Sequence, residues 1–567
     1  MHPVRRRRFR IRYWMVLGLL LSALGLLGIR ATYLQVVASD YLQQQGDARY
    51  LRTVIDNAHR GMILDRNGDP LAISTPVQSV WASPQAFMQA RRRWSVLAIV
   101  LGLGVRDISR QIAKYRDREF TYLKRHVTPE VATRVASLNL PGVFLQREYR
   151  RYYPTGAVSG HVVGFTDIDD RGQEGLELAY DDIMRARPGK KRVLKDLYGN
   201  VVETVESVSL AEPGRDLIVS LDRRIQYLAY RELKRAMQRY GARAGTAIML
   251  DAHTGEVLAM VNQPIFNPNN RTRLTSARFR NRAATDVFEP GSTLKPFTIA
   301  AALETGLLTP DSLINTAPGR LRIGGKTIQD ARDYGLLSVA QVIEKSSNVG
   351  AAKIALSMDS ERLWRVLTRV GFGKTTGSEL PAESAGLVNP PSQWVPIDQA
   401  TLSFGYGISV TALQLARAYA VLANDGVRVP ITLLRRDGPL RGERVMSART
   451  ARQIRAMLEL AVSEEGTGTA ARLMHYRVAG KTGTVHKLVP GGYAEDRYVA
   501  SFAGMAPASK PRLVMVVTVD EPGERRHFGG QTAAPVFSRV MAGALRLLNI
   551  SPDTPKRNLK RKQRIST

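Results

Sequence analysis

The stretch Glu289-Pro290-Gly291-Ser292-Thr293-Leu294-Lys295-Pro296 holds the sharpest local signal of the sequence. Pro290-Gly291 interrupts the preceding chain, and Ser292 can then open a helix whose first turn accepts Pro296, because the first amides of a helix lack an intrahelical partner. On that helix Ser292 and Lys295 stand at positions i and i+3, on one face. The stretch therefore predicts a helix that begins with a serine and a lysine side by side.

A serine beside a lysine can form an activated nucleophile. A hydroxyl attacks poorly unless a neighbour takes its proton, and a lysine does so only when burial or nearby cations lower its pKa. The amide at a helix start can also donate a hydrogen bond to an oxyanion. The alternative interpretation is a helix-capping serine next to an exposed lysine. Ser292 to Lys295 is the only Ser-x-x-Lys tetrapeptide of the chain, so no other serine competes for the role.

Two later segments complete a set of three motifs. Ser346-Ser347-Asn348 follows the first motif, although Ser-x-Asn is common and recurs at 137–139. Lys481-Thr482-Gly483 occurs once; its glycine lets a ligand approach closely, and its lysine and hydroxyl offer donors to an anion. Ser-x-x-Lys, Ser-x-Asn and Lys-Thr-Gly in this order form the signature of penicillin-binding proteins and serine β-lactamases.

The pattern around these motifs predicts the fold of the second half of the chain. Two apolar runs at 245–261 flank a turn-prone segment and predict a hairpin. Helical periodicity dominates to about residue 460, a strand returns at 513–519, and 535–548 reads as a terminal helix. We expect a mixed α/β domain with an antiparallel sheet flanked by helices. The irregular stretch from about 40 to 215 predicts an elongated, β-containing, non-catalytic domain.

The N-terminus predicts a membrane anchor. Residues 13–29 form an uncharged apolar run of 17 residues, which is a minimal span. Six arginines precede it, so the positive-inside rule places the N-terminus in the cytoplasm and the rest of the chain outside. A cleaved signal peptide is the alternative, but its only small-residue site, at 36–38, lies beyond the apolar run. The predicted parts are a cytoplasmic tail 1–12, an anchor 13–37, an N-terminal domain 38–235, a catalytic domain 236–550 and a basic tail 551–567.

Composition narrows the chemistry without choosing a partner. The 567 residues include no cysteine, which excludes thiol nucleophiles, disulfides and cysteine-ligated metals. The net charge is +32, of which +21 lies outside the two basic tails. Such a body suits anionic lipid, an acidic wall polymer or nucleic acid equally well. No histidine shows metal-ligand spacing, so we expect no metal and no cofactor.

A family resemblance extends well beyond the three motifs. The chain resembles the septal class B penicillin-binding proteins, the FtsI type, from the anchor to about residue 550. This resemblance implies a peptidoglycan D,D-transpeptidase of the cytoplasmic membrane that cross-links stem peptides outside the cell during septal wall synthesis and is a target of β-lactams. The N-terminal domain would then be a pedestal or dimerisation domain. The segments that carry the resemblance are 286–292, 345–350, 403–407, 505–508, 60–68, 151–154 and 175–177.

The resemblance also implies the roles of individual residues. Ser292 would be acylated by the penultimate D-Ala of a donor stem peptide, Lys295 would deprotonate it, and Ser346 with Lys481 would relay a proton to the leaving nitrogen. Asn348 would orient Lys295 and hold the substrate amide. The donor's carboxylate and the oxyanion would be bound at Thr482, Gly483 and Thr484, with the amides of Ser292 and Thr484 forming the oxyanion hole.

The resemblance names partners and leaves alternatives open. The implied partners are peptidoglycan stem peptides, lipid-linked precursor strands, β-lactams, the membrane and division proteins, including a SEDS-type glycosyltransferase of the FtsW type; nucleic acid is not among them. An elongation-type class B transpeptidase, a serine β-lactamase and a non-catalytic membrane-bound division scaffold are the alternatives. His486, directly after the third motif, matches no family residue, and we interpret it as a rim residue.

Overall fold

The computed structural model describes residues 3–42, 51–195, 201–272, 275–438, 440–523 and 526–554. The chain divides into two compact units, each built from several segments. Unit 1 comprises Met1–His59, Pro76–Tyr149 and Ala186–Pro213; unit 2 comprises Arg60–Thr75, Arg150–Arg185 and Gly214–Thr567. The basic C-terminal tail beyond residue 554 lies outside the described residues, as do Met1 and His2.

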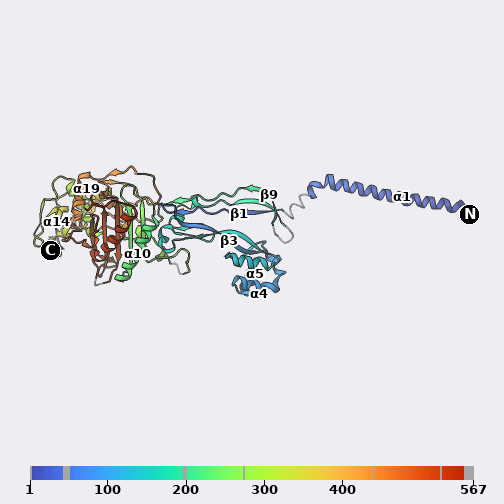
Figure 1. Cartoon of the computed structure of the whole chain (residues 1–567), viewed down its shortest axis with the longest axis horizontal. Coiled ribbons are helices and arrows are strands. Elements are labelled where there is room, and N and C mark those ends of the chain that lie inside the picture. Colours follow the sequence, from blue (N-terminus) through green and yellow to red (C-terminus); the bar gives the residue numbers. More distant parts are fainter. Residues whose placement is uncertain are drawn as a thin grey trace, which may run out of the picture. The chain divides into compact units, whose positions relative to one another are not determined.

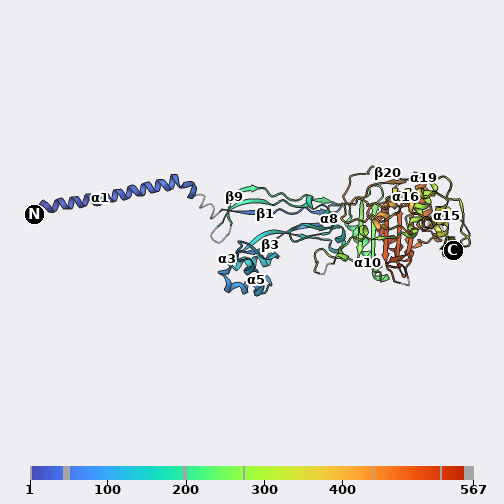
Figure 2. The same cartoon turned by 180° about the vertical axis from the view of Figure 1, so that it is seen from behind.

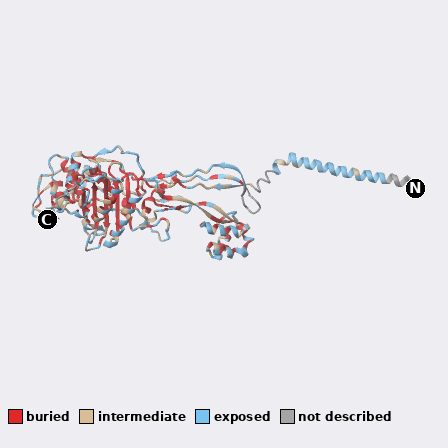
Figure 3. Cartoon of the chain, in the orientation of Figure 1, coloured by how far each residue is buried: buried red, intermediate tan, exposed pale blue. Residues whose placement is uncertain are grey.

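Unit 1 begins with a long apolar helix. Helix α1 (Pro3–Thr32) continues into a π-helical turn, η1 (Tyr33–Val37). Together they include the segment Phe9–Val37, 29 residues with an 18-residue window of mean hydropathy 1.9, which is long and apolar enough to cross a membrane. Its side chains are solvent-exposed along nearly the whole length (Figure 3). Burial in the protein therefore does not account for its apolar character, which is what a membrane segment would show.

The rest of unit 1 combines a ribbon of strands with a small helical core. Strands β1 (Leu51–Asp56), β8 (Gly189–Lys195) and β9 (Val201–Ser209) form a three-stranded antiparallel sheet. The core is formed by Phe87, Trp94, Leu97, Ile108 and Leu123 together with smaller apolar side chains. The elements around that core are α3 (Pro84–Met88), α4 (Trp94–Leu101), α5 (Val105–Lys114), β4 (Thr121–Val127) and α6 (Pro129–Ser137). These strands confirm the prediction of a β-containing N-terminal region.

Two long strands run through both units. Strand β3 (Pro70–Ala82) pairs with β2 (Ile63–Leu64) near its start and with β4 near its end, and β5 (Val143–Tyr152) pairs with β3. Strand β10 (Leu217–Ile218) joins β2 in parallel. The short elements of unit 2 that follow β5 are η3 (Gly156–Val158), α7 (Gly160–Val163), β6 (Phe165–Thr166), β7 (Gly172–Glu174), α8 (Gly175–Ala179) and α9 (Asp181–Met184).

Unit 2 is built on an antiparallel sheet, whose strands are drawn in green and red in Figure 1 and are seen from behind in Figure 2. It has five strands, in the order β12-β11-β23-β22-β21. The strands are β11 (Ala244–Asp251), β12 (Val257–Gln263), β21 (Ala479–Val489), β22 (Gly492–Ala506) and β23 (Leu513–Asp520). The predicted hairpin is β11–β12, and the predicted later strand is β23. Strand β21 lies at the edge of the sheet, so among the described residues one side of its backbone has no neighbouring strand.

Helices cover both faces of this sheet because its side chains alternate. Ala247 and Met249 of β11 pack in one apolar cluster, whereas Ile248 and Leu250 pack in another. Helices α10 (Arg223–Tyr240) and α21 (Ala534–Leu547) belong to the first cluster, and α13 (Lys295–Leu303) and α18 (Ala412–Ala423) to the second. Every residue of α18 is buried, and its two strongly polar side chains, Gln414 and Arg417, donate hydrogen bonds to backbone carbonyls. The buried strands between the helices are visible in Figure 3.

The second face of the sheet carries the larger helical block. The predicted mixed α/β fold with a helix-flanked antiparallel sheet is confirmed. The further helices of the block are α11 (Ser276–Phe279), α12 (Arg282–Thr285), α14 (Val339–Lys345), α15 (Asn348–Leu356), α16 (Ser360–Arg369), α17 (Pro396–Leu402), α19 (Ala448–Leu460) and, beside β22, α20 (Gly529–Thr532). The two-stranded pairs are β13 (Val287–Phe288) with β18 (Val410–Thr411), β14 (Leu313–Asn315) with β17 (Leu336–Ser338), β15 (Arg320–Ile323) with β16 (Lys326–Gln329), and β19 (Val427–Arg428) with β20 (Glu443–Arg444).

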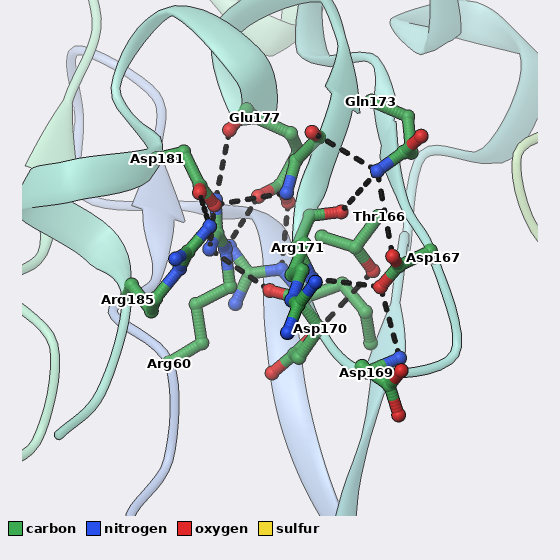
Figure 4. A network of polar contacts seen from close by, with 12 residues as sticks. Arg60, Thr166, Asp167, Asp169, Asp170, Arg171, Gln173, Glu177, Asp181 and Arg185 are labelled. Atoms are coloured by element: carbon green, nitrogen blue, oxygen red, sulfur yellow. Dashed lines mark hydrogen bonds and ion pairs between the residues drawn. The ribbon is translucent and has the colours of Figure 1, made fainter.

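A buried ion-pair network joins distant segments of unit 2 (Figure 4). Arg60 Nε lies 2.7 Å from Glu177 Oε2, and Arg60 Nη1 lies 2.6 Å from Asp181 Oδ1. The other Glu177 oxygen accepts a 2.7 Å hydrogen bond from Arg151 Nε. Arg60, Arg151 and Glu177 are almost fully buried, so these charges are matched away from water. Three segments that carried the resemblance outside the catalytic region therefore meet at one carboxylate.

Candidate active site

Ser292 lies in a tight turn at the start of a buried helix. The turn is a 3₁₀ helix, η4 (Gly291–Leu294), which continues directly into α13. Gly291 has a φ of +56°, and a side chain there would lie 2.4 Å from Val485 Cγ1 on β21. A glycine is therefore required for the serine turn to lie against the edge strand. The prediction of a helix that starts at Ser292 is confirmed, with a tighter first turn.

Lys295 is completely buried and its ammonium nitrogen has four oxygen neighbours. Nζ lies 2.9 Å from Ser292 Oγ and 2.8 Å from Asn348 Oδ1. It also lies 2.6 Å from the Ser346 carbonyl oxygen and 3.1 Å from Ser346 Oγ. The structure thus brings together the predicted residues of the first two motifs, and it rules out the interpretation in which Lys295 is exposed.

The surroundings of Lys295 favour its neutral form. Burial holds the pKa of Lys295 well below its ordinary value, the positive charge of Lys481 lowers it further, and the negative charge of Asp330 opposes both. Burial also lowers the pKa of Lys481, to about 7. A neutral Lys295 has a lone pair with which to accept the proton of a hydroxyl 2.9 Å away.

The second motif reaches Lys295 through an unusual backbone conformation. Helix α14 ends at Lys345, and Ser346 then adopts a left-handed conformation with φ +62°. Ser347 caps the next helix, α15, by accepting a hydrogen bond from Gly350 N at 2.8 Å. The sharp reversal between the two helices turns both the hydroxyl and the carbonyl of Ser346 toward Lys295. A left-handed residue other than glycine is strained, and such strain is concentrated at functional sites.

The third motif lies on the edge strand β21. Lys481 is buried and its Nζ contacts Thr482 O at 3.3 Å and Thr467 Oγ1 at 3.4 Å. Thr467 Oγ1 in turn lies 2.7 Å from Thr482 Oγ1. A side chain at Gly483 would lie 2.9 Å from Pro290 O, so this glycine lets the strand approach the serine turn. Thr484 Oγ1 accepts a hydrogen bond from Gly529 N at 3.0 Å.

Several residues of the site carried no signal in the sequence. Thr467 touches two residues of the third motif but stands in a loop without periodicity. Gly405 lies against the serine turn, since a side chain there would lie 2.2 Å from Gly291 O. Asp330 holds the second motif from a loop after β16. For Gly405 the one hint was the family resemblance at 403–407.

His486 lies on β21, two residues after Thr484. His486 Nδ1 lies 2.9 Å from Ala494 O in the β21–β22 hairpin, and its ring contacts that of Tyr498 at 4.6 Å between centroids. Its assignment as a rim residue stays a prediction. Within the described ranges, histidine and carboxylate side chains do not gather in groups that could hold a metal ion.

The sheet-and-helix domain with these three converging motifs defines the class of penicillin-recognising transpeptidases. Residues 245–542 match the family model of the penicillin-binding protein transpeptidase domain, and residues 55–219 match that of the penicillin-binding protein dimerisation domain. The chain belongs to this family, as a class B penicillin-binding protein of the FtsI type. The resemblance seen in the sequence is thereby confirmed.

Relatives and solved structures agree with this assignment. The chain is 42% identical to the peptidoglycan D,D-transpeptidase FtsI of Escherichia coli, over 96% of this chain and 92% of that protein. The transpeptidase domain of Burkholderia pseudomallei penicillin-binding protein 3 is 45% identical, with a TM-score of 0.55 over 59% of this chain and 98% of that one. Mycobacterium tuberculosis penicillin-binding protein 3, complexed with aztreonam, is 30% identical, with a TM-score of 0.69 over 88% and 99% of the two chains.

Proposed function

We propose that this chain is a peptidoglycan D,D-transpeptidase that cross-links stem peptides through an acyl-serine intermediate during septal wall synthesis. The observation that carries the proposal is the 2.9 Å contact between Ser292 Oγ and the buried nitrogen of Lys295. The names of the relatives support the peptidoglycan substrate. They also favour division over the elongation-type alternative, because FtsI is the name that recurs among them.

In the first step Ser292 is acylated. Its Oγ attacks the carbonyl carbon of the penultimate D-Ala of a donor stem peptide while Lys295 Nζ takes the hydroxyl proton. The C–N bond breaks, and the leaving nitrogen of the terminal D-Ala receives a proton through Ser346 with Lys481. The lowered pKa of Lys481, about 7, suits a group that gives and regains a proton near neutral pH.

In the second step the acyl group passes to an acceptor. An amine of a second stem peptide attacks the ester carbonyl, the ester C–O bond breaks as the new amide bond forms, and the proton lost by the amine returns to Ser292 Oγ. Asn348 orients Lys295 and holds the substrate amide. Thr482 and Thr484 bind the donor carboxylate beside Gly483, and the amides of Ser292 and Thr484 hold the oxyanion. β-Lactams would acylate the same hydroxyl.

Labelling with a fluorescent penicillin tests the nucleophile. Membranes that contain the full chain should label, and Ser292→Ala should abolish labelling, because Ser292 Oγ lies 2.9 Å from Lys295 Nζ, and the other described hydroxyl hydrogen-bonded to that nitrogen, that of Ser346, is assigned to the proton relay. Ser357→Ala, at the end of α15, is a matched control that should label normally. Labelling that survives Ser292→Ala contradicts the proposal, and growth sustained by that variant supports a non-catalytic scaffold.

We also propose that Phe9–Val37 anchors the chain in the cytoplasmic membrane with the N-terminus inside. The length and apolarity of that helix support an anchor, and the six arginines at its start support the orientation. An anchored enzyme would work on lipid-linked precursor strands beside a membrane partner such as a glycosyltransferase of the FtsW type.

The absence of cysteine makes this topology easy to test. Single-cysteine variants His2→Cys and Ser276→Cys have no background thiol, and Ser276 is exposed. In intact spheroplasts a membrane-impermeant maleimide should label Ser276→Cys only, and both after lysis. Labelling of His2→Cys before lysis would reverse the orientation, and release of the chain by alkaline carbonate would contradict the anchor.

A further inference from the structure

Asp330 holds the turn that carries the second motif. It stands in the loop after β16, and its two carboxylate oxygens accept three hydrogen bonds from that turn. Oδ2 accepts from Ser347 Oγ at 2.5 Å, and Oδ1 accepts from Asn348 N at 2.5 Å and from Val349 N at 3.0 Å. These backbone amides belong to the first turn of α15, which has no intrahelical acceptor for them. A single side chain therefore fixes where α15 begins.

The last residue of β16, just before Asp330, decides which end of the Asn348 amide faces Lys295. The Gln329 carbonyl lies 3.1 Å from Asn348 Nδ2, and a carbonyl can only accept, so the nitrogen of the side-chain amide must face Gln329. The oxygen, Oδ1, is then presented to Lys295 Nζ at 2.8 Å. Asn348 thus becomes an obligatory acceptor for the lysine.

This arrangement orients the lone pair of the neutral lysine. A neutral amine has two N–H donors and one lone pair. The carbonyl of Ser346 and Oδ1 of Asn348 can only accept, and they take the two donors at 2.6 and 2.8 Å. The lone pair then faces the hydroxyl side of the site, where Ser292 Oγ lies at 2.9 Å. If the turn shifted away, Lys295 could rotate a donor toward Ser292 and would no longer be a base for it.

Asp330 also contributes a charge. Lys481 from β21 and Asp330 from the loop after β16 are the charged groups that act on Lys295, with opposite signs. Lys345, next to Ser346 on α14, is already paired with Glu344 and Glu465. The anion of Asp330 favours the protonated lysine and the cation of Lys481 favours the neutral one.

We propose that Asp330 is a positioning residue of this transpeptidase, which holds the Ser346–Asn348 turn against Lys295 and places a carboxylate behind that turn. The expected change in acylation rate rests on the proposed function. The expected loss of order in the Ser346–Asn348 turn does not. Asp333, three residues further along the same loop, is the matched control, because its exposed carboxylate caps only Gly335 N, at 2.9 Å.

Two alanine variants of the full chain, Asp330→Ala and Asp333→Ala, test whether Asp330 positions the second motif. Asp330→Ala should lower the second-order acylation constant for a fluorescent penicillin by roughly 10- to 100-fold, because a displaced catalytic group costs that much. It should also speed amide hydrogen exchange in a peptide that covers 345–350, a readout independent of catalysis. Asp333→Ala should change neither. If Asp330→Ala matches Asp333→Ala in acylation and in exchange, the positioning role of Asp330 is contradicted.

An asparagine variant tests the charge and stays informative if the alanine variant misfolds. Asp330→Asn keeps an oxygen that can accept from Asn348 N and Val349 N but loses the anion. Removing the anion makes Lys295 easier to deprotonate, so the acid limb of the acylation-rate profile should move to lower pH. If the acid limb of the Asp330→Asn acylation profile has the same midpoint pH as that of the wild type, the charge of Asp330 does not act on Lys295. Loss of labelling in Ser292→Ala establishes in the same assay that the nucleophile is right, so the two proposals fail separately.

Discussion

Lys295 and Lys481 are both buried lysine side chains, and the charge of Lys481 acts on the pKa of Lys295. Each lysine would have an ordinary pKa in the unfolded chain, whereas burial in the folded chain disfavours both ammonium forms. A charged Lys481 also makes it harder to protonate Lys295. Burial is therefore the main reason why Lys295 favours its neutral form, and a protonated Lys481 adds to the effect.

Lys481→Met should shift the acylation profile in the direction opposite to that of Asp330→Asn. Removing the cation raises the pKa of Lys295, so the acid limb of the rate profile moves to higher pH, and the plateau also falls because a proton relay is lost. Lys487→Met, on the same strand but paired with Asp520 and Glu521, is the control and should leave the midpoint unchanged. The measurement is penicillin acylation across pH 5 to 9, and an unshifted midpoint for Lys481→Met would refute the coupling.

At the residue scale, spacing could find the reacting side chains but not their supports. Ser292 and Lys295 are one helical turn apart, so local geometry predicts their contact. Asp330 reaches the second motif across a loop, and Thr467 reaches the third across another. Neither loop has a hydrophobic period that fixes its path, so only the tertiary fold could reveal these contacts.

Among the elements of unit 2, the serine turn depends on a neighbouring loop, residues 403–407. The backbone carbonyl of Gly405 accepts a hydrogen bond from Gly291 N at 3.1 Å. Its φ of +90° and its closeness to Gly291 leave no room for a side chain. Gly407, two residues on, also has a positive φ, +76°, but nothing lies within 4 Å of the position a side chain would take.

These two glycines allow a matched test. Gly405→Ala should displace the serine turn and lower the acylation constant by roughly 100-fold, since an atom would be forced 2.2 Å from Gly291 O. Gly407→Ala incurs only the backbone strain of a left-handed alanine, about 1 kcal/mol, and should acylate nearly normally. The comparison uses acylation rates with thermal unfolding measured alongside, and equal rates in the two variants would show that the contact is unimportant.

Elements with a clear period were predictable, whereas their arrangement was not. The β11–β12 hairpin, β23, α18 and α21 all follow from local pattern. The order of the sheet places β23 between β11 and β22, which are far apart in the chain. Such pairing depends on packing of both faces and leaves no mark in any single segment.

Buried charges hold unit 2 together at the scale of the whole molecule. Arg60 precedes β2, Arg151 ends β5 and Glu177 lies on α8, so segments separated by up to 117 residues share one network. Removing a single partner from a buried ion pair leaves the other charge uncompensated, and this is far more costly than losing an exposed pair. Sequence likeness at 60–68, 151–154 and 175–177 marked these residues but could not show that they meet.

Arg60→Met should destabilise unit 2 by roughly 3–5 kcal/mol, because Glu177 and Asp181 lose their buried cation. Arg185→Met removes the half-exposed partner of the same Asp181 and should cost about 0–1 kcal/mol. Urea unfolding of the purified full chain, followed by tryptophan fluorescence, gives both values. Similar midpoints for the two variants would mean that the network contributes nothing beyond a surface pair.

The open side of β21 has a further consequence. An outermost strand displays amide and carbonyl groups at fixed intervals, and an extended oligopeptide can dock there as a sixth strand through main-chain groups alone. Binding of that kind depends on the backbone geometry of the peptide more than on the identity of its side chains. An enzyme with such a template beside its nucleophile can accept stems of differing composition, and a rigid bicyclic mimic of a peptide bond can occupy the same place.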